Sequence, residues 1–271
     1  MREKWKGRTR IHEEMLYNLG VDGVKYNWIS GGFRQPAETG VIECILQSGG
    51  MPMISYEALK HNEEIRAYIT MADRSLAALG FTEHSFAHVT KVAETAGYIL
   101  ETTGHTPHEV ELVKIAGFLH DIGNVVNRVD HSQSGAVMAF QLLRGMDISP
   151  EDLATIVTAI GNHDEGTGVP VDDLSAALII ADKSDVRRSR VRNQDKTTFD
   201  IHDRVNYSVK QAVLKINEDK TNIKLKMHID TKYGSIMDYF EIFLGRMTLC
   251  RRAARKLGLE FKLIINEQTL L

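Results

Sequence analysis

The chain has 271 residues, 43% of them hydrophobic and 25% charged, with a formal net charge of −3 at pH 7. This composition predicts a globular protein with one sizeable core, and the small net charge gives no general attraction to DNA or to an anionic membrane. Cys44 and Cys250 form no CxxC pair, so neither a disulfide framework nor a cysteine-rich zinc site is expected, and a reducing cytoplasm fits this usage.

The N-terminal segment, residues 1–50, is rich in Gly and Pro and holds no hydrophobic period, so it is predicted to be an irregular arm. Its first residues lack the apolar region of a secretory signal. The sequence also contains no run of about 18 apolar residues, and no transmembrane helix is therefore expected.

The pattern of residues 51–197 predicts a helical domain. Apolar residues at helical spacing predict a first helix from about residue 54 to a stop at Gly80. The segments "TPHE" (106–109) and "SPED" (149–152) each combine an N-cap hydroxyl, a proline and an acidic third residue, which marks a helix start. Further helices are predicted over 109–121, 131–145, 152–164 and 171–188.

The C-terminal residues 198–271 change period and predict a small α+β unit. Residues 222–230, "NIKLKMHID", alternate strictly between apolar and polar, as a half-buried strand does, and residues 211–217 are its expected hairpin partner. A long helix follows from Ser235 to Gly258, and "EFKLIIN" closes as a strand. The expected fold is therefore a mainly α helical bundle with a strand-strand-helix-strand appendage. The exposed sheet edge would allow pairing in a homodimer.

Several histidines and aspartates lie at or within these apolar helical runs, where a charge is costly unless it is paired or bound to a metal. A single such histidine is more often a hydrogen-bonded core or surface residue than a ligand. Together they form a set on successive helices, which is how helix bundles build metal centres. The set consists of His88, His120, Asp121, His131, His163, Asp164 and Asp182.

The size of this set exceeds the four ligands of one tetrahedral zinc ion. Two divalent ions about 3.5–4 Å apart, with Asp121 as a bridge, would use it. Imidazole and carboxylate donors without thiolate suit Mn, Fe, Ni, Zn, Co or Mg and do not distinguish among them.

The motifs resemble those of the HD-domain superfamily of metal-dependent phosphohydrolases. "HVTKVAETA", "LHDIGN" and "HSQSGA" resemble its first three motifs, and "HDEGTGVP" is similar to the HHE…GxGxP segment of HD-GYP cyclic-di-GMP phosphodiesterases. "ADKSDVRRSRVR" resembles the closing motif and is similar to that of ribonuclease Y. The resemblance covers about residues 80–192. It implies a hydrolase that cleaves a phosphomonoester or phosphodiester, of a nucleotide in the first instance, with metal-activated water.

The resemblance also implies residue roles. His88, His120, Asp121 and Asp182 would form the basic metal set, and His131 and His163 would add a second ion. Asp121 or Asp164 would orient water or protonate the leaving oxygen. Two positions depart from the family pattern, because Asn124 replaces its frequent Lys and Asp164 replaces the second His of the HHE motif.

Because Asn124 cannot supply a positive charge, another cation is expected to bind the phosphate of the substrate. Lys183 and Arg187 lie nearest to Asp182 in sequence and are the predicted phosphate-binding pair, with Lys183 also expected to act in catalysis and Asn124 kept as a substrate contact. The alternative is that this basic cluster, 183–192, is a solvated helix end. The second basic run, 246–256, has the spacing of an exposed helix face and is taken as structural.

Three other interpretations exist, of which the sequence disfavours the first. His84 and His88 have the spacing of a zinc-protease HExxH motif, but Ser85 stands where that motif needs Glu, so His84 is expected to be a surface or supporting residue or an alternative ligand. A di-iron oxygenase of the HD type would use similar ligands. A non-catalytic nucleotide sensor is the third possibility. RNA is not the preferred substrate, since no KH-type GxxG element is visible.

Overall fold

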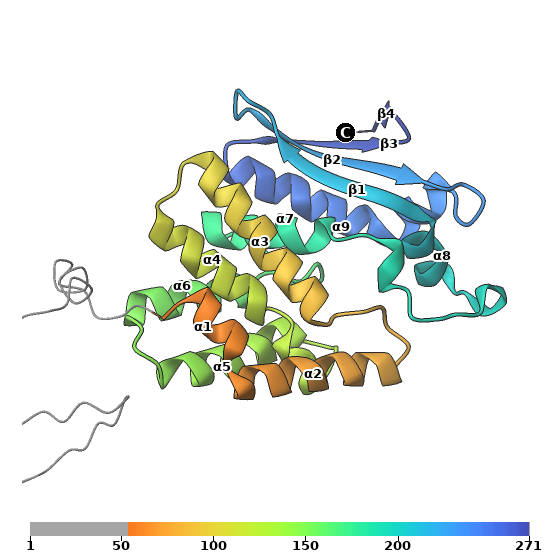
Figure 1. The fold of residues 1–271 in the computed structure, drawn as a ribbon. Coiled ribbons are helices and arrows are strands. Elements are labelled where there is room, and N and C mark those ends of the chain that lie inside the picture. The colour runs from red at the N-terminus through yellow and green to blue at the C-terminus, as the bar shows by residue number, and fades with distance from the viewer. Residues whose placement is uncertain (1–53, 271) are drawn as a thin grey trace, which may run out of the picture. The chain divides into compact units, whose positions relative to one another are not determined.

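The computed structural model describes residues 54–270 of the chain. The predicted irregular arm, residues 1–50, lies outside the described residues. Residues 54–270 belong to one compact unit, which is mainly helical with a small sheet near the C-terminus (Figure 1). The predicted mainly α fold with an α+β appendage is confirmed.

The helical body follows the predicted order of elements. It consists of α1 (Tyr56–His61), α2 (Glu63–Ala78), α3 (Phe86–Thr103), α4 (Pro107–Leu119), η1 (Ile122–Val125), α5 (His131–Arg144), α6 (Pro150–Gly161) and α7 (Asp173–Ser184). At the start of α4 the Thr106–Glu109 capping box forms in both directions. At the start of α6 the Ser149 side chain accepts from the Asp152 amide, which is half of the predicted box.

The first predicted helix is divided in two. Asn62 adopts an extended conformation with ψ 116°, and its side chain accepts a hydrogen bond from the Ile65 amide, so it caps the start of α2. The first amides of a helix have no acceptor within the helix, and an asparagine side chain at the N-cap supplies one. A continuous helix would not need this cap, so Asn62 marks the start of a second helix. The helix then ends as predicted before Gly80, which has a φ of 82°.

The C-terminal part contains the predicted strand-strand-helix-strand unit and four short elements that the sequence pattern did not predict, η2, η3, α8 and β4. Its elements are η2 (Arg188–Arg190), η3 (Lys196–Thr198), α8 (Ile201–Ser208), β1 (Val209–Ile216), β2 (Asn222–Ile229), α9 (Ile236–Lys256), β3 (Glu260–Ile265) and β4 (Gln268–Thr269). The sheet order is β1-β2-β3-β4, with β2 and β3 parallel and the other neighbours antiparallel.

Helix α9 connects the sheet to the helical body. In Figure 1 the sheet lies along one side of α9, and α7 lies on the other side. The alternation of β2 agrees with this layering, because its apolar positions are buried and its lysines are exposed. One apolar core runs through the body and the layer beneath the sheet. The predicted domain boundary at residue 197 stays a prediction.

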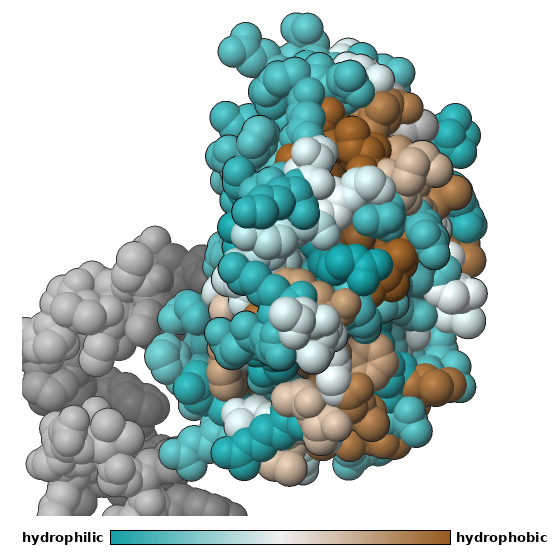
Figure 2. All heavy atoms as spheres, turned by 90° about the vertical axis from the view of Figure 1, so that its right-hand side faces the viewer, coloured by the Kyte–Doolittle hydropathy of each residue, from teal (hydrophilic) through white to brown (hydrophobic). Residues whose placement is uncertain are grey.

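The surface in Figure 2 is largely hydrophilic, and apolar side chains form separate patches among the polar ones. Within residues 54–270, no helix combines the length and the apolar character that a membrane span requires.

Candidate metal centre

A close contact between α3 and α4 brings the first two histidines together. The contact depends on Gly117, where an added Cβ would lie only 2.7 Å from the Cα of Ala93. His88 lies in the first turn of α3 and His120 directly follows α4, and their ring centroids are 5.2 Å apart. Both side chains are fully buried.

A second close contact brings Asp121 to the start of α5. Gly123 lies so near this helix that any side chain there would collide with the carbonyl of His131 and the amide of Gly135. The glycine of "HDIG" therefore has a packing role. It allows η1 to lie against α5 and so places Asp121 within reach of His131.

All four clustered histidines have their Nδ1 atoms next to a hydrogen-bond acceptor. These pairs are His88 with Asp185 Oδ2 at 2.8 Å, His120 with the Gly117 carbonyl at 2.8 Å, His131 with the Arg128 carbonyl at 3.1 Å, and His163 with the Ile160 carbonyl at 2.6 Å. An acceptor at Nδ1 requires a proton there, which leaves the Nε2 lone pair of each neutral ring free to bind a metal.

The carboxylate of Asp121 lies between two groups of these nitrogens. Its Oδ2 is 3.3 Å from Nε2 of His120 and 3.5 Å from Nε2 of His88. Its Oδ1 is 3.5 Å from Nε2 of His131, which lies 3.2 Å from Nε2 of His163. The two oxygens therefore face different histidine pairs, as a bridging carboxylate would.

Asp182 completes one side of the cluster from α7. Its Oδ1 lies 3.4 Å from Nε2 of His88 and 3.7 Å from Nε2 of His120, while its Oδ2 is 2.6 Å from Nζ of Lys183. One oxygen thus faces the histidines, and the lysine holds the other.

The donor atoms fit a divalent ion. Nε2 of His88, Nε2 of His120 and Oδ2 of Asp121 are buried without a hydrogen-bond partner, although buried polar atoms are almost always satisfied. Three groups of ligand atoms could each hold an ion, because the atoms within each group lie within 4.8 Å of one another. The groups share members, and together they contain all six predicted metal ligands. Borderline nitrogen and oxygen donors of this kind bind divalent transition metals.

The electrostatics of the cluster are those of ionised carboxylates facing imidazoles. Burial acts to raise the pKa of Asp182, but Lys183 and the facing histidines hold it well below its usual range. Burial acts to lower the pKa of His120, but the carboxylates of Asp121 and Asp182 outweigh it and raise this pKa to about 10. Burial and the neighbouring His120 lower the pKa of His163, so this ring is neutral.

Asp185 is a supporting residue that the sequence did not reveal. It is 2% exposed, accepts hydrogen bonds from His88 and from Nε of Arg187 at 3.0 Å, and forms an ion pair with Nζ of Lys91 at 2.8 Å. Arg187 also donates to Glu83 at 3.1 Å. The guanidinium of Arg187 is therefore bound by two carboxylates on the Nδ1 side of His88, and its contact with substrate stays a prediction.

Lys183 is buried as well, with an exposed fraction of 4%. It bridges Asp182 and Glu165, whose Oε2 lies 2.7 Å from Nζ, and Glu165 also accepts from Nε of Arg246 on α9 at 2.9 Å. The interpretation of residues 183–192 as a solvated helix end is wrong for Lys183 and for Arg190, which is 5% exposed. The basic run 246–256 was predicted to be an exposed helix face, but its first residue, Arg246, supports the cluster through Glu165.

The remaining predicted residues lie around Asp121 and His131. Asn124 is buried, and its amide donates to Oδ1 of Asp121 at 2.9 Å, so it orients that carboxylate; a contact with substrate stays a prediction. Asp164 is partly exposed, with Oδ1 3.8 Å from Nε2 of His131. Arg128, which the sequence reading missed, places its NH1 atom 3.3 Å from the same nitrogen.

His84 has a supporting position beside the cluster. Its Nδ1 lies 2.7 Å from the Thr82 carbonyl, and its ring centroid is 5.3 Å from that of His88. Burial, together with Arg190, lowers its pKa, so the ring is neutral. Among the described residues, the groups of ligand atoms that could hold a metal do not include it.

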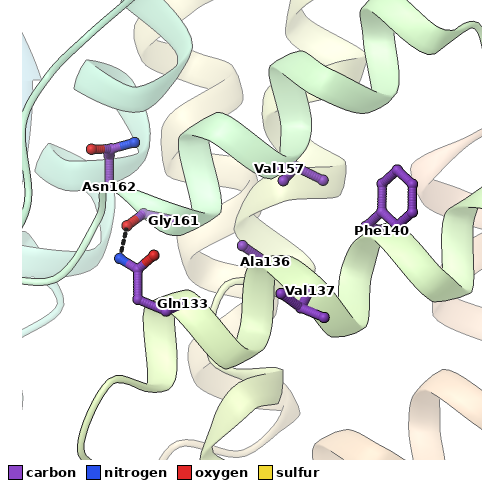
Figure 3. A pocket seen from close by; sticks show the side chains of 7 residues that line it. All are labelled: Gln133, Ala136, Val137, Phe140, Val157, Gly161 and Asn162. Atoms are coloured by element: carbon purple, nitrogen blue, oxygen red, sulfur yellow. Dashed lines mark hydrogen bonds between the residues drawn. The ribbon is translucent and has the colours of Figure 1, made fainter.

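A hollow of about 400 Å³ between α5 and α6 is a separate feature (Figure 3). Its lining is mostly apolar and contains none of the six predicted ligands. The lining residues are Gln133, Ala136, Val137, Phe140, Val157, Gly161 and Asn162. In Figure 3, Gln133 donates to the Gly161 carbonyl across the gap, at 2.8 Å, and so ties the two helices together next to His131 and His163.

The family comparison covers the whole cluster. The model of the HD domain matches residues 85–241, more than half of the chain, and extends beyond residue 192 into α9. An uncharacterized protein of Methanocaldococcus jannaschii is 22% identical over 209 residues, which are 68% of this chain and 80% of that protein. The chain belongs to the HD domain family, whose members are in general metal-dependent phosphohydrolases.

Proposed function

We propose that this protein is a hydrolase that cleaves a phosphoester bond in a small phosphorylated substrate, a nucleotide, with two divalent ions held by its buried cluster. The observation that carries the proposal is the position of Asp121 between two histidine pairs, whose Nδ1 atoms all have acceptors. His88, His120 and Asp182 would hold one ion, His131 and His163 the other, and Asp121 both.

Divalent ions at such a centre supply Lewis acidity, since they lower the pKa of water towards neutrality and stabilise negative charge on phosphoryl oxygens. The protein's own residues would set the rest of the chemistry. Asp164 has its carboxylate at the partly exposed edge of the cluster, 3.8 Å from His131. It is positioned to orient the attacking water or to protonate the leaving oxygen.

Lys183 supports this chemistry indirectly in the present geometry. Because it lies 2.6 Å from Asp182, it keeps that carboxylate ionised and directs one oxygen to the histidines. The nucleotide part of the proposal is supported by the likeness of "HDEGTGVP" to cyclic-dinucleotide phosphodiesterases. The replacement of a family Lys by Asn124 favours a substrate other than cyclic-di-GMP.

The test is a phosphate-release screen over nucleoside monophosphates, cyclic nucleotides, alarmones and model phosphodiesters, with Mn²⁺, Ni²⁺, Mg²⁺ and Fe²⁺ supplied in turn. Elemental analysis of the purified protein accompanies the screen. We expect turnover with at least one metal, and loss of both metal content and turnover in His120→Ala and Asp121→Ala. His228, exposed on β2, provides the matched control His228→Ala.

Three results would contradict the proposal. Turnover that persists in a metal-stripped His120→Ala/Asp121→Ala variant would show that the cluster is not the reaction centre. Binding of nucleotides without turnover under every metal would instead favour a sensor, and tightly bound iron with oxygen consumption would favour a di-iron oxygenase.

A further inference from the structure

A phosphoester hydrolase needs a cation that contacts the phosphate, and Asn124 removes the one that the family motif often supplies. Several cations surround the cluster, but most are already bound to carboxylates. Lys183 lies 2.6 Å from Asp182, Lys91 lies 2.8 Å from Asp185, and Arg187 lies 3.0 Å from Asp185. Each of these charges is neutralised at close range and is not free for an incoming anion.

Arg190 is committed in a different way. It is buried, and it donates to the main-chain carbonyls of Asp185 at 2.9 Å and Glu83 at 2.8 Å. Its donors therefore join the loop that follows α7 to the segment that precedes α3.

Arg128 differs from all of these cations. Its NH1 lies 3.3 Å from Nε2 of His131 and 3.4 Å from Oδ1 of Asn124, and both are neutral acceptors. Within residues 54–270, its closest carboxylate oxygen is Oδ1 of Asp121, at 4.0 Å. The side chain is 22% exposed, so one guanidinium reaches from solvent to the metal-facing side of the cluster.

The position of Arg128 is fixed at both ends. Its carbonyl accepts the hydrogen bond from Nδ1 of His131 at 3.1 Å, so its main chain is held next to that histidine. Its guanidinium lies over the ring of Phe81, 5.7 Å from the centroid. This cation–π contact stabilises the positively charged side chain in its position. An ion on His131 would use the Nε2 lone pair, so NH1 would then lose that acceptor and remain a free donor beside the ion.

We propose that Arg128 is the phosphate-binding residue of this centre and takes the place of the lysine absent at position 124. The inference rests on the proposed function and names the group that would bind the phosphoryl oxygens. A planar guanidinium can grip two oxygens at once, which suits it to this task.

The test compares the full-length wild type with Arg128→Gln, Arg128→Lys and the control Arg144→Gln, each loaded with Mn²⁺. Binding of inorganic phosphate is measured by calorimetry, and metal content by elemental analysis. We expect Arg128→Gln to weaken phosphate binding by about 10- to 100-fold, as for loss of a charged hydrogen bond, with its metal content unchanged. Arg128→Lys should restore part of the affinity, and Arg144→Gln, an exposed change near the end of α5, should match the wild type.

Three results would overturn the inference: wild-type affinity in Arg128→Gln, a loss of Mn²⁺ that accounts for its weaker binding, or no phosphate binding by the Mn²⁺-loaded wild type. A failure of the proposed function would look different. If the wild type binds phosphate and Arg128→Gln does not, yet no phosphoester is cleaved, then Arg128 still binds phosphate and the hydrolase proposal fails.

Discussion

Oδ2 of Asp185 lies 2.8 Å from Nδ1 of His88, and both side chains are buried. This contact fixes the ring so that Nε2 faces Asp121 and Asp182. Three positive groups hold Asp185 in turn: Lys91, Arg187 and Arg190. Burial acts to raise the pKa of Asp185, but these partners and His88 keep it well below its usual range, so the carboxylate is ionised.

Asp185→Ala is therefore expected to weaken metal binding. Loss of a residue that orients a metal-binding histidine typically costs about 10- to 100-fold in metal affinity. Competition with a chelator in a Mn²⁺ titration measures the effect. Asp173→Ala at the start of α7 is the control, because Asp173 is partly exposed and pairs with His105 away from the cluster. Equal affinity in Asp185→Ala and the wild type would contradict this role.

The sequence was sufficient to predict which histidines and aspartates form the cluster, but not the residues that support them. His88, His120 and Asp182 stand out because each interrupts an apolar helical run, and this local signal needs no knowledge of the fold. Asp185 and Arg246 give no such signal, since their partners are 97 and 81 residues away in the chain. These pairs form only in the folded chain, where α3 and α9 both pack on α7 and Glu165 lies in the loop between α6 and α7.

The difference between local and long-range signals also explains why the sequence predicts the long elements but not a short strand such as β4. The strict alternation of β2, the capping box of α4 and the Ser235 start of α9 are local patterns, and the structure contains these elements at the predicted places. The two-residue strand β4 exists because β3 offers it an open edge. A period cannot be read from two residues, so such a strand depends on the neighbour that it pairs with.

Asp121 and His131 should differ in how many ions they control. Asp121 faces both histidine pairs, whereas His131 contacts only the Oδ1 side. We expect His131→Ala to lower the bound metal from about two ions to about one per chain, and Asp121→Ala to lower it to about zero, since a shared bridge serves both ions. Elemental analysis after dialysis against Mn²⁺ measures this. Identical stoichiometry in the two variants would contradict a bridging Asp121.

Metal loading should release protons near neutral pH. Burial lowers the pKa of His120, but Asp121 and Asp182 outweigh it and raise the pKa to about 10, so the ring of the metal-free protein is protonated at pH 8. A metal on Nε2 must displace that proton. We expect release of at least about one proton per chain, and an apparent affinity that rises about tenfold per pH unit for each proton released.

Calorimetric titrations with Mn²⁺ at pH 8 in buffers of different ionisation enthalpy count these protons. His105→Gln is a control for the release, because His105 pairs with Asp173 at the surface. Heats that do not depend on the buffer would show that His120 is neutral before the metal binds.

Arg246 should stabilise the packing of α9 against the metal-binding cluster, because Glu165 and Lys183 link it to Asp182. Burial acts to raise the pKa of Glu165, but Lys183 and Arg246 outweigh it and hold the pKa well below its usual range. Because the folded-state pKa is lowered, the stabilisation is fully present above the ordinary value of 4.5 and is lost gradually as the pH falls from that value through the lower folded-state pKa. Both side chains of the Arg246–Glu165 pair are partly exposed, so Arg246→Gln should cost no more than about 1 kcal/mol at pH 7.

Lys183→Met should cost far more, because Lys183 is buried and its loss leaves Asp182 and Glu165 without their shared cation. Removing one partner of a buried ion pair typically costs about 3–5 kcal/mol. Urea unfolding of the metal-free proteins at pH 7 and at pH 3.5 gives both free energies of unfolding, with Arg252→Gln on the exposed face of α9 as the control. Because Glu165 stays ionised in the folded protein at pH 3.5, the deficit of Arg246→Gln should be no larger there than at pH 7. A deficit that grows there, or a Lys183→Met variant as stable as Arg252→Gln at pH 7, would contradict an ion-pair chain from α9 to Asp182.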